Sequence, residues 1–163
     1  MLRNIKFNLI TVLISISLQM FNTSYAHEID LKEISIEHPM IPIFNSKMKT
    51  AAGYFTIVNK RNKADELIMV KTDFAKAMMH LSKIDENGIA SMEYVDKVII
   101  PGNSSVVFEQ GSLHIMFTQL KEPLEDYMDK KVTLVFKNLG DIEIDFQVEK
   151  VTQNMNMNNN HDH

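Results

Sequence analysis

Residues 142–149 read Ile-Glu-Ile-Asp-Phe-Gln-Val-Glu, so that every apolar residue is followed by a polar one. Successive side chains of a β-strand point to opposite faces of the sheet. The alternation therefore predicts a strand with one buried and one solvated face. Similar short segments occur throughout the chain, at residues 29–37, 54–59, 67–72, 78–84, 90–95, 105–110, 114–120 and 132–137. We therefore expect a chain built mainly from short strands.

Turn sequences separate these segments, among them Asn87-Gly88, Pro101-Gly102 and Gly111-Ser112. No long segment shows a helical period bounded by caps, although residues 74–79 are compatible with one helical turn. Short strands joined by tight turns predict a single all-β domain, folded as a Greek-key β-sandwich or a small barrel.

The first 26 residues have the features of a removed export signal. Arg3 and Lys6 precede an apolar stretch at 7–18, and small residues end at Ala26, where cleavage is expected. A membrane anchor is the alternative, but the apolar stretch is shorter than the roughly 20 residues that a spanning helix needs. We therefore predict a periplasmic protein without stable membrane insertion.

The last ten residues, 154–163, consist of Asn, Met, His and Asp and offer little to bury. Such a segment is expected to be disordered without a ligand. The predicted organisation is thus a signal peptide at 1–26, a β domain at 27–153 and a tail at 154–163.

Composition excludes several classes of function. The chain has no cysteine, which excludes disulfides, Cys-rich zinc sites and blue-copper centres. Its 21 acidic residues outnumber its 17 basic ones, and no basic run is interleaved with aromatic residues, so no nucleic-acid partner is expected. The sequence also lacks a nucleophile elbow, a phosphate-binding glycine loop and a motif that pairs carboxylates. We therefore expect a binding protein and not an enzyme.

The strongest candidate site consists of His80, Met92, His114 and Met116. Thioether sulfur binds Cu(I) well and hard cations poorly, whereas imidazole accepts either class of metal. Residues 114 and 116 share one face of a strand because they are two positions apart. A hairpin at Asn87-Gly88 would bring His80 and Met92 near each other. Together these residues predict a site for one Cu(I).

Each of these residues also has a structural interpretation. Isolated histidines are usually solvated or hydrogen-bonded, and methionines usually fill cores. We interpret four other methionines as core residues: Met48, Met69, Met78 and Met128. Met78 or Met79 would replace His80 in the site if the strand register slipped by one residue.

The ends of the mature chain offer a possible second copper site, as Cu(II). Cleavage after Ala26 would leave His27 with a free α-amine beside its imidazole, which is a compact chelate. Further donors lie in the tail, at Met155, Met157, His161 and His163. The alternative is a solvated end of low complexity.

The chain resembles the periplasmic copper chaperones of the PCu(A)C family. Their signature is His or Met, ten residues, Met, twenty-one residues and His-x-Met. Met92 and His114 enclose twenty-one residues, and His114-Ile115-Met116 matches His-x-Met, whereas His80 and Met92 enclose eleven residues. Met40 also stands where the family commonly has tryptophan. The resemblance covers nearly the whole β domain, through the segments 36–39, 52–59, 101–102, 111–116 and 120–124.

This resemblance implies a cupredoxin-like fold and a Cu(I) cargo. It also implies delivery of copper to the binuclear centre of cytochrome c oxidase, with the copper-site subunit of the oxidase and a Sco-type protein as partners. Three other functions remain open: copper storage or resistance in the periplasm, a copper-dependent redox enzyme, and an exported β-sandwich binding module with no metal role.

Overall fold

The computed structural model describes residues 29–30 and 34–151. Within them the chain forms strands and no helix, so the helical turn considered for residues 74–79 is not formed. The strands are β1 (Ile29–Asp30), β2 (Ile34–Ile43), β3 (Ala51–Asn59), β4 (Asp65–Lys71), β5 (Lys76–Ile84), β6 (Ala90–Tyr94), β7 (Val98–Ile100), β8 (Ser104–Phe108), β9 (Leu113–Thr118), β10 (Asp129–Phe136) and β11 (Gly140–Lys150). The predicted signal peptide and tail lie outside the described residues.

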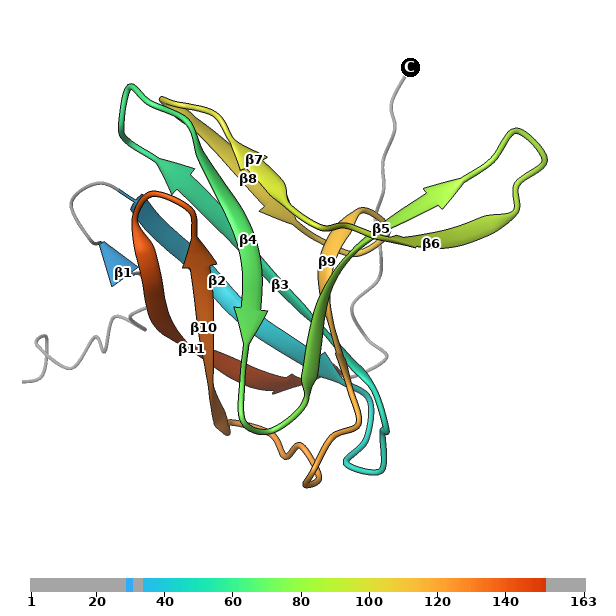
Figure 1. Ribbon diagram of the computed structural model, residues 1–163. Coiled ribbons are helices and arrows are strands. Elements are labelled where there is room, and N and C mark those ends of the chain that lie inside the picture. Colours follow the sequence, from blue (N-terminus) through green and yellow to red (C-terminus); the bar gives the residue numbers. More distant parts are fainter. Residues whose placement is uncertain (1–28, 31–33, 152–163) are drawn as a thin grey trace, which may run out of the picture.

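The strands form one curled sheet (Figure 1) in the order β6-β5-β9-β3-β2-β11-β10-β4-β7, with β1 added to β2 and β8 added to β3. All neighbours are antiparallel except β11 and β2, which run parallel. The hairpin of β5 and β6 projects from the body of the sheet, and β6 lies at its edge. The all-β class predicted from the alternating segments is confirmed.

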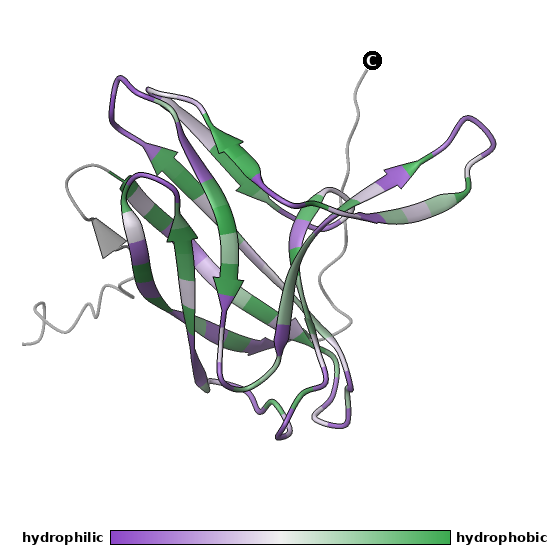
Figure 2. Cartoon of the chain, viewed as in Figure 1, coloured by the Kyte–Doolittle hydropathy of each residue, from purple (hydrophilic) through white to green (hydrophobic). Residues whose placement is uncertain are grey.

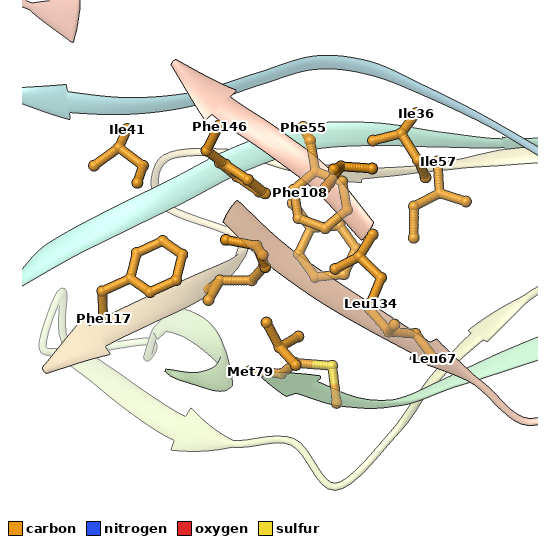
Figure 3. Packing of buried hydrophobic residues seen from close by; sticks show 14 of the residues in the cluster. Ile36, Ile41, Phe55, Ile57, Leu67, Met79, Phe108, Phe117, Leu134 and Phe146 are labelled. Carbon is orange, nitrogen blue, oxygen red and sulfur yellow. The ribbon is translucent and has the colours of Figure 1, made fainter. Parts of the chain in front are cut away.

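A single hydrophobic core fills the curl of this sheet, and the segment at 142–149 shows why it forms. The apolar residues of β11 are all buried, while its polar residues are exposed or half-buried. This alternation is visible along the strands in Figure 2. The core is rich in phenylalanine (Figure 3): the rings of Phe55 and Phe108 stack with centroids 4.2 Å apart, and Phe146 meets Phe55 edge-on at 5.5 Å. Edge-to-face and offset-stacked pairs are favourable arrangements of aromatic rings.

Strand β2 contains an irregularity at its centre. Its register against β3 shifts between Glu37 and Met40, and the exposed His38 has φ of 52°. Before this point β2 pairs with β3, and beyond it residues 40–43 also pair with β11. The bulge thus lies where the neighbour on one edge of β2 changes from β1 to β11.

Asp65, at the start of β4, is a buried carboxylate (1% exposed) that ties two distant segments together. It accepts hydrogen bonds from the backbone N–H groups of Asn138 (3.0 Å) and Leu139 (3.2 Å), which lie in the turn between β10 and β11. The Asn138 side-chain amide (3.1 Å) and the Arg61 guanidinium (3.2 Å) donate to it as well. A buried carboxylate is tolerated where it has such partners.

Candidate metal centre

The two candidate histidines face each other across neighbouring strands. In the antiparallel pairing of β5 with β9, His80 lies directly opposite His114, and their ring centroids are 6.0 Å apart. Met116 shares the face of His114, while Ile115 and Phe117 between and beyond them are fully buried. The prediction that β9 presents His114 and Met116 on one face is therefore confirmed, and the core side of the strand fixes its position.

The register of β5 decides which of Met78, Met79 and His80 lie on the outer face of the strand. His80 lies on the outer face with His114, whereas Met79 points inward and is only 3% exposed. Met78 is on the outer face, opposite Met116. The slipped register that would have placed Met79 in the site is thus absent. The methionines interpreted as core residues are not all buried, because Met69 on β4 is 51% exposed.

The predicted hairpin at Asn87-Gly88 exists and carries Met92 to the same face. Gly88 adopts φ of 78°, which glycine tolerates without steric cost, and the Asp85 carboxylate accepts the Asn87 N–H at 2.9 Å. In the register of β5 and β6, His80 pairs with Tyr94 and Ser82 pairs with Met92. Met92 is therefore a diagonal neighbour of His80. The spacing of eleven residues places both donors on one face.

A surface pocket of about 280 Å³ brings Met92, His114 and Met116 together. Its wall is completed by residues at the start of β3, on β5 and in the turn before β9, most of them small: Thr50, Ala51, Ala52, Ser82, Gln110 and Gly111. Tyr54 and Met48 also line it, and His80 does not. The sequence did not single out Tyr54, and it assigned Met48 to the core. The only signal in the sequence was that Ala52 and Tyr54 are two positions apart on β3, which places both on the face that carries the pocket.

Hydrogen bonding prepares His114 to act as a ligand. Its Nδ1 lies 3.0 Å from the carbonyl oxygen of Ser112, which can only accept, so Nδ1 carries the proton in the neutral ring. The Nε2 lone pair is then available to a metal, in the arrangement common among metal-binding histidines. His114 as a whole is 4% exposed, so its surroundings restrict the orientation of its ring.

His80 is suited to ligation for a different reason. Its Nδ1 is buried and has no hydrogen-bond partner. Burial, and in second place the nearby His114, lowers the pKa of His80 below its ordinary value of 6.5. The imidazole therefore stays neutral to lower pH, and the neutral ring is the form that binds metals.

The donor set determines which metal fits. In residues 29–30 and 34–151, no three His, Asp or Glu side chains are grouped so that they could hold a metal ion. The candidate site therefore depends on methionine sulfur, which favours Cu(I). The terminal candidates His27, Met155, Met157, His161 and His163 all lie outside the described residues.

Comparison with known proteins identifies the family and the fold. A family model described as "Putative lipoprotein LpqE-like" matches residues 34–148. The chain belongs to the LpqE-like family. The curled β-sheet of this LpqE-like protein is also similar to solved structures of PCuAC domains, which confirms the cupredoxin-like fold that the resemblance implied.

Two of these structures come from the proteins PmoF2 and PmoF1. The copper-bound PCuAC domain of PmoF2 is 27% identical with a TM-score of 0.63, over 77% of this chain and 99% of that domain. The apo PCuAC domain of PmoF1 is 25% identical with a TM-score of 0.66, over 77% and 100%. The Cu(I) form of DR1885 from Deinococcus radiodurans shares the fold, with 22% identity and a TM-score of 0.56 over 68% of this chain and 74% of that one.

A curated relative, the uncharacterized protein RP573 of Rickettsia prowazekii (strain Madrid E), is 33% identical over 91 residues. The match covers 55% of this chain, and the chain spans about half the length of that relative.

Gly53 of β3 keeps the sheet behind the pocket closely packed. A Cβ atom at this position would lie 2.7 Å from Phe117 and 3.1 Å from Phe146. We expect Gly53→Ala to lower the free energy of unfolding by about 1–3 kcal/mol, because the rings must shift in a filled core. Urea unfolding followed by circular dichroism measures this change. An unchanged midpoint would show that the core has room for the methyl group.

Proposed function

We propose that this LpqE-like protein is a periplasmic copper chaperone that binds one Cu(I) through His80, Met92, His114 and Met116. The observation that carries the proposal is the pocket that brings Met92, His114 and Met116 together, with His80 opposite His114. The similarity to copper-bound PCuAC domains supports a copper cargo.

The proposed site combines a buried ligand with an exposed one. A protein that must both hold and release its cargo needs such a combination. His114 is buried and held by Ser112, whereas Met92 is 50% exposed on the projecting hairpin. Imidazole and thioether are neutral donors, so they bind Cu(I) without adding negative charge to the site. An exposed thioether can be displaced by a ligand of the acceptor. We therefore propose transfer by stepwise ligand exchange.

None of the described residues belongs to a helix that is long and apolar enough to cross a membrane. The family description names lipoproteins, which are exported. Together with the signal peptide predicted at 1–26, this description supports a periplasmic location. N-terminal analysis of the mature protein tests it, with His27 as the expected first residue.

Binding of Cu(I) should depend on pH through the histidines and not through the methionines. Thioethers do not protonate in the physiological range, whereas protonated imidazole cannot bind. Because the pKa of His80 is lowered from 6.5, we expect constant affinity above about pH 6.5 and a decline below it. Competition titrations from about pH 8 to pH 5 measure this. Affinity that stays constant to acid pH would contradict histidine ligation.

We propose the binuclear copper centre of cytochrome c oxidase as the acceptor, with a Sco-type protein acting alongside. In the direct test, the Cu(I)-loaded protein is mixed with the separately purified, copper-free soluble domain of the oxidase copper subunit. After separation, copper is expected on the oxidase domain. Retention of copper by the loaded protein would contradict delivery to this acceptor.

Copper storage or resistance is the alternative function of the same site. Deletion of the gene in cells distinguishes storage from delivery. Deletion of a delivery protein should lower oxidase activity, and added copper should restore it. Deletion of a storage protein should leave oxidase activity intact and make cells sensitive to copper.

A further inference from the structure

The pocket contains a third thioether that belongs to none of the three strands that carry the predicted site. Met48 lies in the segment between β2 and β3 and lines the same 280 Å³ pocket as Met92, His114 and Met116. The remaining candidate ligand, His80, lies outside this lining and meets His114 across the sheet. The pocket thus contains three sulfurs and one imidazole.

The position of the Met48 side chain is defined by its surroundings. It is half-buried and packs against the edge of the hydrophobic core, and its sulfur accepts the backbone N–H of Phe44 at 3.4 Å. A thioether sulfur has two lone pairs, so this weak hydrogen bond leaves one for a metal. The contact holds the sulfur in place within an otherwise exposed turn.

Met48 and Met92 reach the pocket from different parts of the fold. Met92 comes from the hairpin at the sheet edge, whereas Met48 comes from the turn that leads into β3. Ala52, which also lines the pocket, lies opposite Met116 and presents only a methyl group. Met48 also lines an adjoining pocket of about 470 Å³ and therefore stands at the border of the two.

We propose that Met48 is a further Cu(I) ligand that exchanges with His80. The ion then has two overlapping donor sets that share Met92, His114 and Met116. In the exchange a bond from copper to the His80 nitrogen breaks while a bond to the Met48 sulfur forms, and copper remains Cu(I). This inference rests on the proposed function, because it assigns a ligand to the same pocket.

The test uses the mature protein with 13C-labelled methionine methyl groups and Cu(I) as the probe. With one equivalent of Cu(I), the methyl signals of Met48, Met92 and Met116 are expected to shift. The Met48→Leu variant is expected to bind Cu(I) about tenfold more weakly, at the lower end of the effect of changing a metal-site residue. Leucine retains the volume of methionine and lacks the sulfur, so the fold is preserved.

Met128→Leu provides the matched control. Met128 is also half-buried, and its sulfur accepts the Glu125 N–H at 3.2 Å, but it does not line the pocket. Its methyl signal should not shift, and its replacement should leave Cu(I) affinity unchanged. If Met48→Leu binds Cu(I) as tightly as Met128→Leu while Met92 and Met116 shift, the inference is overturned and the proposed function stands. If no methionine shifts and no copper binds, the proposed function fails, and the role of Met48 fails with it.

Discussion

Replacing His114 with alanine is expected to lower the affinity for Cu(I) by about 100-fold or more. Loss of the residues that merely support metal ligands already costs about 10- to 100-fold. His114 is buried, is oriented by Ser112 and lies at the centre of the site, between His80 and Met116. No other described imidazole except His80 shares this face, so no nearby nitrogen can replace it.

The chain provides a control for each donor type. His38 is exposed at the bulge of β2, and Met69 is exposed on β4, outside the residues that line the pocket. Competition with a chromophoric Cu(I) chelator should show weak binding by His114→Ala and Met116→Leu, and unchanged binding by His38→Ala and Met69→Leu. Equal affinities in all four variants would assign copper binding to another part of the chain.

Replacing Asp65 with alanine is expected to lower the free energy of unfolding by about 3 kcal/mol or more. The carboxylate accepts two part-buried backbone N–H groups from the turn between β10 and β11, and its loss leaves these donors without their partner. Its pairing with Arg61 is lost as well. Because β10 pairs with β4, the change would loosen one edge of the sheet.

Urea unfolding measures this effect, and Asp141→Ala is the control. Asp141 forms an ion pair with Lys71 at 3.0 Å, but both side chains are more than half exposed. Exposed pairs contribute about 0–1 kcal/mol, so this variant should unfold near the midpoint of the unmutated protein. Similar midpoints for the two variants would contradict the structural role assigned to Asp65.

Local patterns predicted most strands, and the failures have local causes. Strand β7 was missed because Val98–Ile100 is too short to show an alternating period. The strand expected at residues 29–37 ends later than predicted, because β2 continues through the left-handed His38 to Ile43. Residues 74–79 were compatible with a helical turn, whereas pairing with β9 makes a strand from Lys76 onward.

The candidate site was predictable where it depends on local geometry. The two-residue spacing placed His114 and Met116 on one face, and the hairpin turn brought Met92 back toward His80. The direct opposition of His80 and His114 could not be derived in this way, because the register of β5 against β9 is set by distant core contacts. Met48 was assigned to the core and not to the pocket that it lines, because it lies between strands, where neither the helical nor the strand period gives a side chain a direction.

The most direct test of the central claim is a competition titration of the unmutated mature protein, without residues 154–163, against a chromophoric Cu(I) chelator. We predict that the protein removes one equivalent of Cu(I) from the chelator, as a pocket with Met92, His114 and Met116 should. If the chelator retains all the copper, the His and Met cluster is not a copper site, and this LpqE-like chain is better described as a β-sandwich binding module.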